Sequence, residues 1–171
     1  TGNGARALYY VYQGVLDEKG GELRVNLLLN RAACSVDVYS DLPYEGRVKL
    51  RIKKPLTRVL VRMPEWVTEK TERLECTVHG ERRAPCWQGR YLDLGSAQPG
   101  NEVAVAFPVP ERTIKEQIGQ LDCTLLLRGS TVVSISPAGK MCPLYAREPY
   151  RNSQMQWRPV RRFVADALID W

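Results

Sequence analysis

The stretch Arg47-Val48-Lys49-Leu50-Arg51-Ile52-Lys53 decides the fold class, because cations alternate with aliphatic residues along it. In an extended strand, successive side chains point to opposite faces of the sheet, so a period of two separates the two kinds of residue. The pattern therefore predicts a half-buried strand of an antiparallel sheet, with Val48, Leu50 and Ile52 in the core and the cations in solvent.

Similar short apolar segments lie on both sides of this strand, separated by turn signals and not by helices. The segments that we expect to form strands are Glu22–Leu29, Ala32–Ser40, Thr57–Met63, Arg73–Val78, Arg90–Leu94, Glu102–Val109, Cys123–Leu127 and Thr131–Ile135. The clearest turns are Gln98-Pro99-Gly100-Asn101 and a hairpin tip at His79-Gly80. This spacing predicts a mostly β protein, an antiparallel, jelly-roll-like β-sandwich over residues 21–136.

The first 20 residues show a helical period instead. The apolar residues recur on one helical face at Leu8, Val11, Tyr12, Val15 and Leu16. Asn3 is expected to cap the helix, because its short side chain can accept a hydrogen bond from a free backbone N–H group. We therefore predict one amphipathic helix, Gly4–Leu16, that ends at Gly20-Gly21, where glycine permits a left-handed turn.

Residues 137–171 follow neither period. Prolines interrupt this segment at Pro137, Pro143, Pro149 and Pro159, and its apolar residues gather near the end at Phe163, Val164, Ala167, Leu168, Ile169 and Trp171. We expect an irregular C-terminal tail that packs on the sandwich or on a neighbouring domain.

Composition limits the partners of the chain. Its 171 residues, of which 44% are hydrophobic, are enough for one domain with a buried core. No apolar run reaches the length of a membrane-spanning helix, so no membrane partner is expected. The net charge of +6 permits an anionic partner, but the alternating strand places its cations on a solvated face. The basic cluster Arg158, Arg161 and Arg162 beside Trp157 comes without a nucleic-acid-binding motif, so nucleic acid is not expected either.

The five cysteines are Cys34, Cys76, Cys86, Cys123 and Cys142. Their number is odd and no C-x-x-C pair occurs, which favours a reducing, cytoplasmic compartment, while a periplasmic or secreted location stays open. Ligands at the spacing of a tetrahedral zinc site are missing, so we expect no metal site in this segment.

No catalytic residue can be assigned from the sequence. The single histidine, His79, sits beside glycine in a turn, and no nucleophile or phosphate-binding motif is present. A glycosidase needs two carboxylates about 5–10 Å apart. The available acids, Glu45, Glu65, Asp93 and Glu102, lie in turns or at strand ends, and no pair stands out.

Carbohydrate contact is the one binding role with candidate residues. Trp66 and Trp87 offer aromatic faces on which a sugar ring could stack, and the alternative is that each anchors the core or a domain interface. Asn3, at the start of the helix, is the third candidate.

A series of short motifs resembles the C-terminal β-sandwich region of β-L-arabinofuranosidase-type glycoside hydrolases, family 127 and its relatives. The motifs are Asn3-Gly4-Ala5-Arg6, Val25–Leu29, Val61–Trp66, Val78-His79-Gly80, Gly89–Leu94, Pro99–Pro108 and Leu126–Val133. Their common order from residue 3 to residue 133 makes the set more specific than any one motif. The chain departs from the family pattern at His79, Asn101 and Ser130-Thr131, which marks a divergent branch.

The resemblance implies how this chain relates to an enzyme. In that family an (α/α)6 barrel is followed by one or two β-sandwiches, so residues 1–20 would be the closing helix of a missing barrel. The implied chemistry uses a cysteine thiolate nucleophile, other cysteines and a glutamate around zinc, and an acid/base glutamate, all in the barrel. By this alignment they fall upstream of Thr1. The implied partner is therefore the barrel, and zinc belongs to it and not to this segment.

Three functional hypotheses follow. The first is a non-catalytic sandwich of a glycoside hydrolase that supports the barrel in plant-type polysaccharide or oligosaccharide degradation. The second is a stand-alone carbohydrate-binding module, and the third is a basic interaction domain for an anionic polymer. The helix favours the first over the second, because a stand-alone module needs no amphipathic helix. Its apolar face, without a barrel, also predicts self-association into a homodimer.

Overall fold

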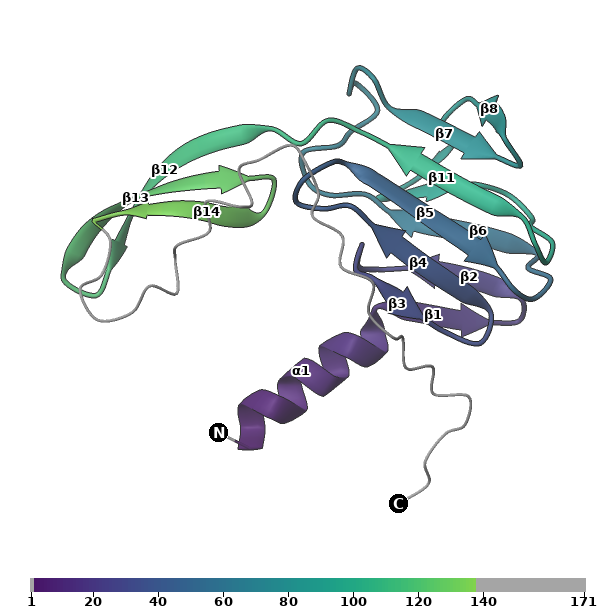
Figure 1. Ribbon diagram of the computed structural model, residues 1–171, viewed down its shortest axis with the longest axis horizontal. Coiled ribbons are helices and arrows are strands. Elements are labelled where there is room, and N and C mark those ends of the chain that lie inside the picture. The colour runs from purple at the N-terminus through teal and green to yellow at the C-terminus, as the bar shows by residue number, and fades with distance from the viewer. Residues whose placement is uncertain (1, 138–171) are drawn as a thin grey trace.

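The computed structural model of the protein describes residues 2–137 (Figure 1). The predicted tail, 137–171, thus lies outside the described residues except for Pro137. The elements are α1 (Gly2–Gly14), β1 (Leu16–Lys19), β2 (Glu22–Val25), β3 (Arg31–Ala32), β4 (Val36–Ser40), β5 (Arg47–Ile52), β6 (Arg58–Arg62), β7 (Glu75–Val78), β8 (Glu81–Arg83), β9 (Trp87–Gln88), β10 (Tyr91–Asp93), β11 (Glu102–Ala106), β12 (Glu111–Ile118), β13 (Leu121–Arg128) and β14 (Thr131–Ser136).

The strands form a two-layer sandwich and one further sheet. A five-stranded sheet has the order β1-β2-β6-β10-β9, and a six-stranded sheet has the order β3-β4-β5-β11-β7-β8. All pairings are antiparallel except that of β2 with β6. Strands β12, β13 and β14 form a three-stranded sheet that projects beyond one end of the sandwich (Figure 1). The mostly β fold with one preceding helix is as the sequence predicts.

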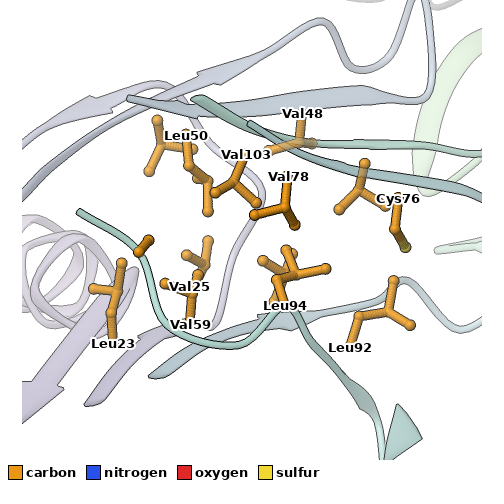
Figure 2. Packing of buried hydrophobic residues seen from close by; sticks show 14 of the residues in the cluster. Leu23, Val25, Val48, Leu50, Val59, Cys76, Val78, Leu92, Leu94 and Val103 are labelled. Atoms are coloured by element: carbon orange, nitrogen blue, oxygen red, sulfur yellow. The ribbon is translucent and has the colours of Figure 1, made fainter. Parts of the chain in front are cut away.

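The core lies between the two layers of the sandwich. Figure 2 shows Val48, Leu50, Cys76, Val78 and Val103 of the six-stranded sheet facing Leu23, Val25, Val59, Leu92 and Leu94 of the five-stranded sheet region. Strand β5 alternates between exposed and buried positions, and its Val48, Leu50 and Ile52 are each 1% exposed. The prediction from the alternating stretch is therefore confirmed. Full burial of such side chains contributes about 1.5–3 kcal/mol each.

The end of the helix differs from the prediction. Helix α1 ends at Gly14, and Leu16–Lys19 forms β1, which pairs with β2 from Leu16↔Val25 to Lys19↔Glu22. Gly20 and Gly21, expected to end the helix, instead form the two-residue turn of this hairpin, with φ values of 61° and 81°. A two-residue hairpin turn with positive φ at both positions favours glycine for the same reason as a helix end does. Asn3 lies inside the first turn and not before it.

The strands differ from the prediction in two further places. The strand expected over Glu22–Leu29 ends at Val25. After it, the backbone N–H groups of Asn26 and Leu27 both donate to Val15 O, at 2.8 Å and 3.4 Å. Strand β12 is not predicted at all, since nearly all of its side chains are exposed and its sequence has no apolar alternation. The hairpin tip at His79-Gly80 is confirmed between β7 and β8, with φ values of 56° and 79°.

Among the residues described, no helix is both long and apolar enough to cross a membrane.

Candidate functional site

A groove opens where the five-stranded sheet meets the turn between β13 and β14. Its walls come from the loop after β2, the end of β6, the start of β10 and Arg128–Thr131, and its cavity volume is about 560 Å³. We call this site the junction groove. Its apolar lining includes Leu27–Leu29 and Met63, and its charged lining consists of Arg62, Glu65, Arg90 and Arg128.

Trp66 holds the two walls of the junction groove together. Its indole Nε1–H donates to Pro108 O at 3.1 Å, just before β12. A Cβ atom placed at Gly129 would lie 2.7 Å from the Trp66 ring, so the ring packs directly on the bare backbone of the β13–β14 turn. Trp66 is therefore an interface anchor, which is the structural alternative that the sequence leaves open, and it also lines the groove.

Two arginines, Arg62 and Arg90, line the groove. Arg62 is opposite Tyr91 in the register of β6 and β10, and Arg90 immediately precedes Tyr91. Backbone and side chain both join Arg90 to Met63: the Met63 N–H donates to Arg90 O at 2.9 Å, and Arg90 donates through Nη2 to Met63 O at 3.1 Å. Neither arginine forms an ion pair with any described residue. A third, Arg128, donates through Nη2 to Tyr44 O at 2.9 Å.

Asn26 links the groove to helix α1. Its Oδ1 accepts a hydrogen bond from Tyr91 Oη at 2.7 Å, and its Nδ2 donates to Gly14 O at 3.0 Å. The same side chain thus lines the groove and satisfies a carbonyl at the end of the helix, where backbone acceptors lack intrahelical partners.

The other sequence candidates lie elsewhere. Trp87 is half-buried and lines a separate hollow of about 440 Å³ with Val67–Lys70, although Arg90 borders both sites. Asn3 is exposed in the first turn of α1 and lines neither cavity. The fold therefore does not gather Trp66, Trp87 and Asn3 into one binding surface.

Most of the candidate acids are engaged with neighbouring cations. Three of the four carry ion pairs with neighbouring cations: Glu45 with Arg47 at 3.5 Å, Asp93 with Arg58 at 2.6 Å, and Glu102 with Lys49 at 3.2 Å. The hydrogen bond from Arg58 lowers the pKa of Asp93, which keeps this carboxyl ionised and makes it a poor general acid. Glu65 is the one acid of the four that lines the junction groove.

A nucleophilic thiol and a set of metal ligands are two further kinds of reactive group that the described residues could supply. Cys76 and Cys123 are buried, and burial raises the pKa of the Cys76 thiol, so it stays protonated and unreactive at neutral pH. The described residues contain no group of three or more His, Cys, Asp or Glu side chains that could hold a metal ion.

Helix α1 presents a second unusual surface. All described side chains of residues 3–14 are exposed, and five large ones are at least half exposed: Leu8, Tyr9, Tyr10, Val11 and Tyr12. Among the described residues, Asn26 and Arg31 of β3 fix the C-terminal end of α1, and Arg31 donates through Nη1 to the carbonyls of Tyr12 and Gln13. The Arg31 guanidinium also lies 4.4 Å from the centroid of the Tyr12 ring. Figure 1 shows the rest of the helix pointing away from the sandwich.

Sequence reasoning missed the arginines of the groove and Arg31 at the helix end. Arg62, Arg90 and Arg128 come from segments far apart in the chain, and only the strand order brings them to one place. No local motif distinguishes them from the other cations. A basic residue near the end of a helix is the signal that could have identified Arg31. The sequence places the end of the helix at Leu16 and not at Gly14, so this signal could not be used.

Solved glycoside hydrolases share this fold. A GH127 β-L-arabinofuranosidase from Geobacillus stearothermophilus T6 is 21% identical over the match, with a TM-score of 0.56, and the match covers 76% of this chain and 22% of that chain. A second GH127 β-arabinofuranosidase is 19% identical with a TM-score of 0.54, covering 69% of this chain and 23% of that one. No protein-family model and no curated protein sequence matches the chain. The resemblance is therefore confirmed at the level of the fold, and this chain spans less than a quarter of either enzyme.

Proposed function

We propose that this chain is a non-catalytic β-sandwich of a glycoside hydrolase resembling β-L-arabinofuranosidases, and that it supports a catalytic helical barrel. The degradation of plant-type polysaccharides or oligosaccharides is the proposed setting. The observation that carries the proposal is the exposed apolar face of helix α1, combined with the firm attachment of its C-terminal end to the sandwich.

A helix of 13 residues is marginal in water unless one of its faces packs on a partner. The sandwich does not supply that partner, since none of the described side chains of residues 3–14 is buried. A helical barrel would, because side chains of neighbouring helices interlock along their length. The attachment by Asn26 and Arg31 would then transmit the orientation of the barrel to the sandwich.

The chemistry of the described residues agrees with a supporting role. The ion-paired acids offer no acid/base pair, and the buried Cys76 is a poor nucleophile. The resemblance implies zinc for the barrel, and the described residues of this chain contain no ligand set that fits it. We therefore assign the nucleophile and the acid/base residue to the barrel.

Co-expression tests the docking directly. The full chain would be co-expressed with the helical barrel of a GH127 β-L-arabinofuranosidase that lacks its own sandwich. We expect the two to co-elute, and the α1 amides to become protected from hydrogen exchange. Val11→Glu should abolish both effects. Val11 is 50% exposed in the free chain, so a charge at this position should leave the fold intact and disrupt the packing of α1 on the barrel. The matched control is Gln117→Glu at an exposed position of β12.

Failure to co-elute, or co-elution that Val11→Glu leaves intact, would contradict docking through α1. Sequencing the natural reading frame beyond both ends of this chain gives an independent test, since the proposal requires a barrel with a cysteine and a glutamate for catalysis in the same protein or operon.

An activity assay tests the non-catalytic part. The purified chain should not hydrolyse aryl arabinofuranosides or other aryl glycosides at any pH, with zinc and reductant present. Turnover above a buffer blank that is lost on mutating a residue of this chain would overturn the claim.

The alternative functions, and the self-association expected of the free helix, can each be tested. A stand-alone carbohydrate-binding module is favoured by the position of Trp66 in the junction groove, and it predicts a monomer that binds sugar without a barrel. A homodimer through α1 predicts a concentration-dependent increase in mass by light scattering, which Val11→Glu abolishes. The basic-domain hypothesis is weakened, because Arg47, Lys49 and Lys53 of the alternating stretch pair with Asp41, Glu102 and Asp37.

A further inference from the structure

We infer that the junction groove binds an acidic sugar, a hexuronate unit of an oligosaccharide, and that Arg62 and Arg90 hold its carboxylate. This goes beyond the supporting role, and it rests on the groove and not on helix α1.

The charges of the groove are the first argument. Arg62 makes no hydrogen bond or ion pair with a described residue, and Arg90 uses a single guanidinium nitrogen, on Met63 O. Several other arginines of the sandwich do pair with acids: Arg24 with Glu22, Arg47 with Asp41, Arg58 with Asp93 and Arg82 with Glu75. Among the described residues Glu65 is the one acid that lines the groove, so Arg62 and Arg90 retain donors for a ligand anion.

The placement of the two arginines is the second argument. Arg62 is opposite Tyr91, and Arg90 is aligned with Met63, the residue after Arg62, so strand alternation alone does not place the two arginines on the same face. The Arg90 guanidinium instead turns back to the backbone of Met63, with Nη2 3.1 Å from Met63 O. This contact places the Arg90 guanidinium beside the residue that follows Arg62, and both arginines line the groove, so both border the space for one ligand carboxylate. The planar fork of a guanidinium matches the two oxygens of a carboxylate, and such charge-assisted bonds are roughly twice as strong as neutral ones.

The remaining lining favours a sugar over a small inorganic anion. A volume of about 560 Å³ lies within the range of about 300–1,000 Å³ for small-molecule sites, far more than one phosphate fills. Trp66 and the leucines give apolar surface for the C–H face of a ring, while Ser130 and Thr131 provide hydroxyl groups that can hydrogen-bond to the hydroxyls of the sugar. A carboxylate on a sugar ring satisfies the cationic and the aromatic parts together.

Calorimetry with the full chain tests the inference. The probes are trigalacturonate, neutral galactotriose and inorganic phosphate. We expect trigalacturonate to bind at least tenfold more tightly than galactotriose, and phosphate not to displace it at equal concentration. Arg62→Gln should weaken trigalacturonate binding at least tenfold, and the double variant Arg62→Gln/Arg90→Gln should abolish it. Arg51→Gln, an exposed arginine of β5 outside the groove, is the matched control and should bind like the wild type.

Arg62 has no partner to lose among the described residues, so its substitution should leave the far-UV circular dichroism and the melting temperature unchanged. Equal affinity for the neutral trisaccharide, or no binding of trigalacturonate at millimolar concentration, would overturn the inference. So would equal weakening by Arg51→Gln, which would indicate non-specific charge attraction, or displacement by phosphate, which would indicate a site for small anions. None of these results depends on the barrel, so this inference and the proposed function fail separately.

Discussion

Strand β5 and helix α1 have equally clear amphipathic patterns, yet their apolar sides end in opposite environments. Leu50 of β5 is 1% exposed, whereas Leu8 of α1 is 72% exposed. The strand finds its cover within the chain, because β4 and β11 flank it and the five-stranded sheet packs on its inner face. Within residues 2–137 the helix has no such cover. An amphipathic pattern therefore predicts that a partner exists, and not that it belongs to the same chain.

The largest expected effect tests this contrast with the same substitution in both regions. Leu50→Ala should lower the free energy of unfolding by about 2–5 kcal/mol, because it leaves a cavity in the sandwich core. Leu8→Ala removes the same atoms from an exposed site and should change it by no more than about 0.5 kcal/mol. Lys49→Ala, on the solvated side of β5, should also stay within about 0.5 kcal/mol. Urea denaturation measures all three, and similar costs for Leu50→Ala and Leu8→Ala would mean that the helix face is covered in the free chain.

The next effect concerns the junction of the sandwich with the three-stranded sheet. Gly129 and Gly119 both have positive φ in hairpin turns, 58° and 65°, but only Gly129 faces the Trp66 ring. Each substitution by alanine should cost about 1–2 kcal/mol for the left-handed conformation. Gly129→Ala should cost about 1–3 kcal/mol more, because its Cβ overpacks the ring. The difference in urea midpoint measures the Trp66 contact, and equal midpoints would show that the ring can move aside.

A smaller effect is expected at the end of the helix. Arg31 donates to the last carbonyls of α1 and stacks on Tyr12, and a cation at a helix C-terminus contributes about 0.3–1 kcal/mol. Arg31→Ala should therefore speed amide hydrogen exchange along α1 while leaving the protection of β5 unchanged. Arg6→Ala, at an exposed position within the helix, is the control and should not speed it. Equal loss of protection in α1 and β5 would mean that the helix and the sandwich unfold as one unit.

The sequence predicts what local periodicity determines. Val48, Leu50 and Ile52 are assigned correctly because a period of two has one structural meaning on a half-buried strand. The pair Gly20-Gly21 is misassigned because positive φ suits a helix end and a hairpin turn alike. Strand β12 is missed since exposure on both faces removes the alternation. The junction groove could not be predicted, because Arg62, Arg90 and Arg128 meet only through the strand order.

The smallest expected effect is a pH dependence of stability, which should be present in the sandwich and absent from the Arg31 contacts at the end of helix α1. The Arg58–Asp93 ion pair joins β6 to β10 at the surface of the five-stranded sheet, and the hydrogen bond from Arg58 lowers the pKa of Asp93 in the folded state. A depressed carboxyl pKa stabilises the fold at pH values above the unfolded pKa of about 3.9, and this contribution disappears as the pH falls through the folded pKa. The contacts of Arg31 at the end of α1 are with backbone carbonyls, which do not titrate.

Acidification below about pH 4 should therefore weaken the sandwich through Asp93 without changing the Arg31 contacts at the helix end. The effect should be modest, because the pair is partly exposed to solvent. Asp93→Asn should flatten the decline of the urea midpoint between about pH 5 and pH 2. Glu81→Gln, at an exposed site of β8, is the control and should keep the wild-type slope. If the urea midpoints of Asp93→Asn and the wild type fall equally as the pH is lowered, Arg58 does not lower the pKa of Asp93 in the folded state.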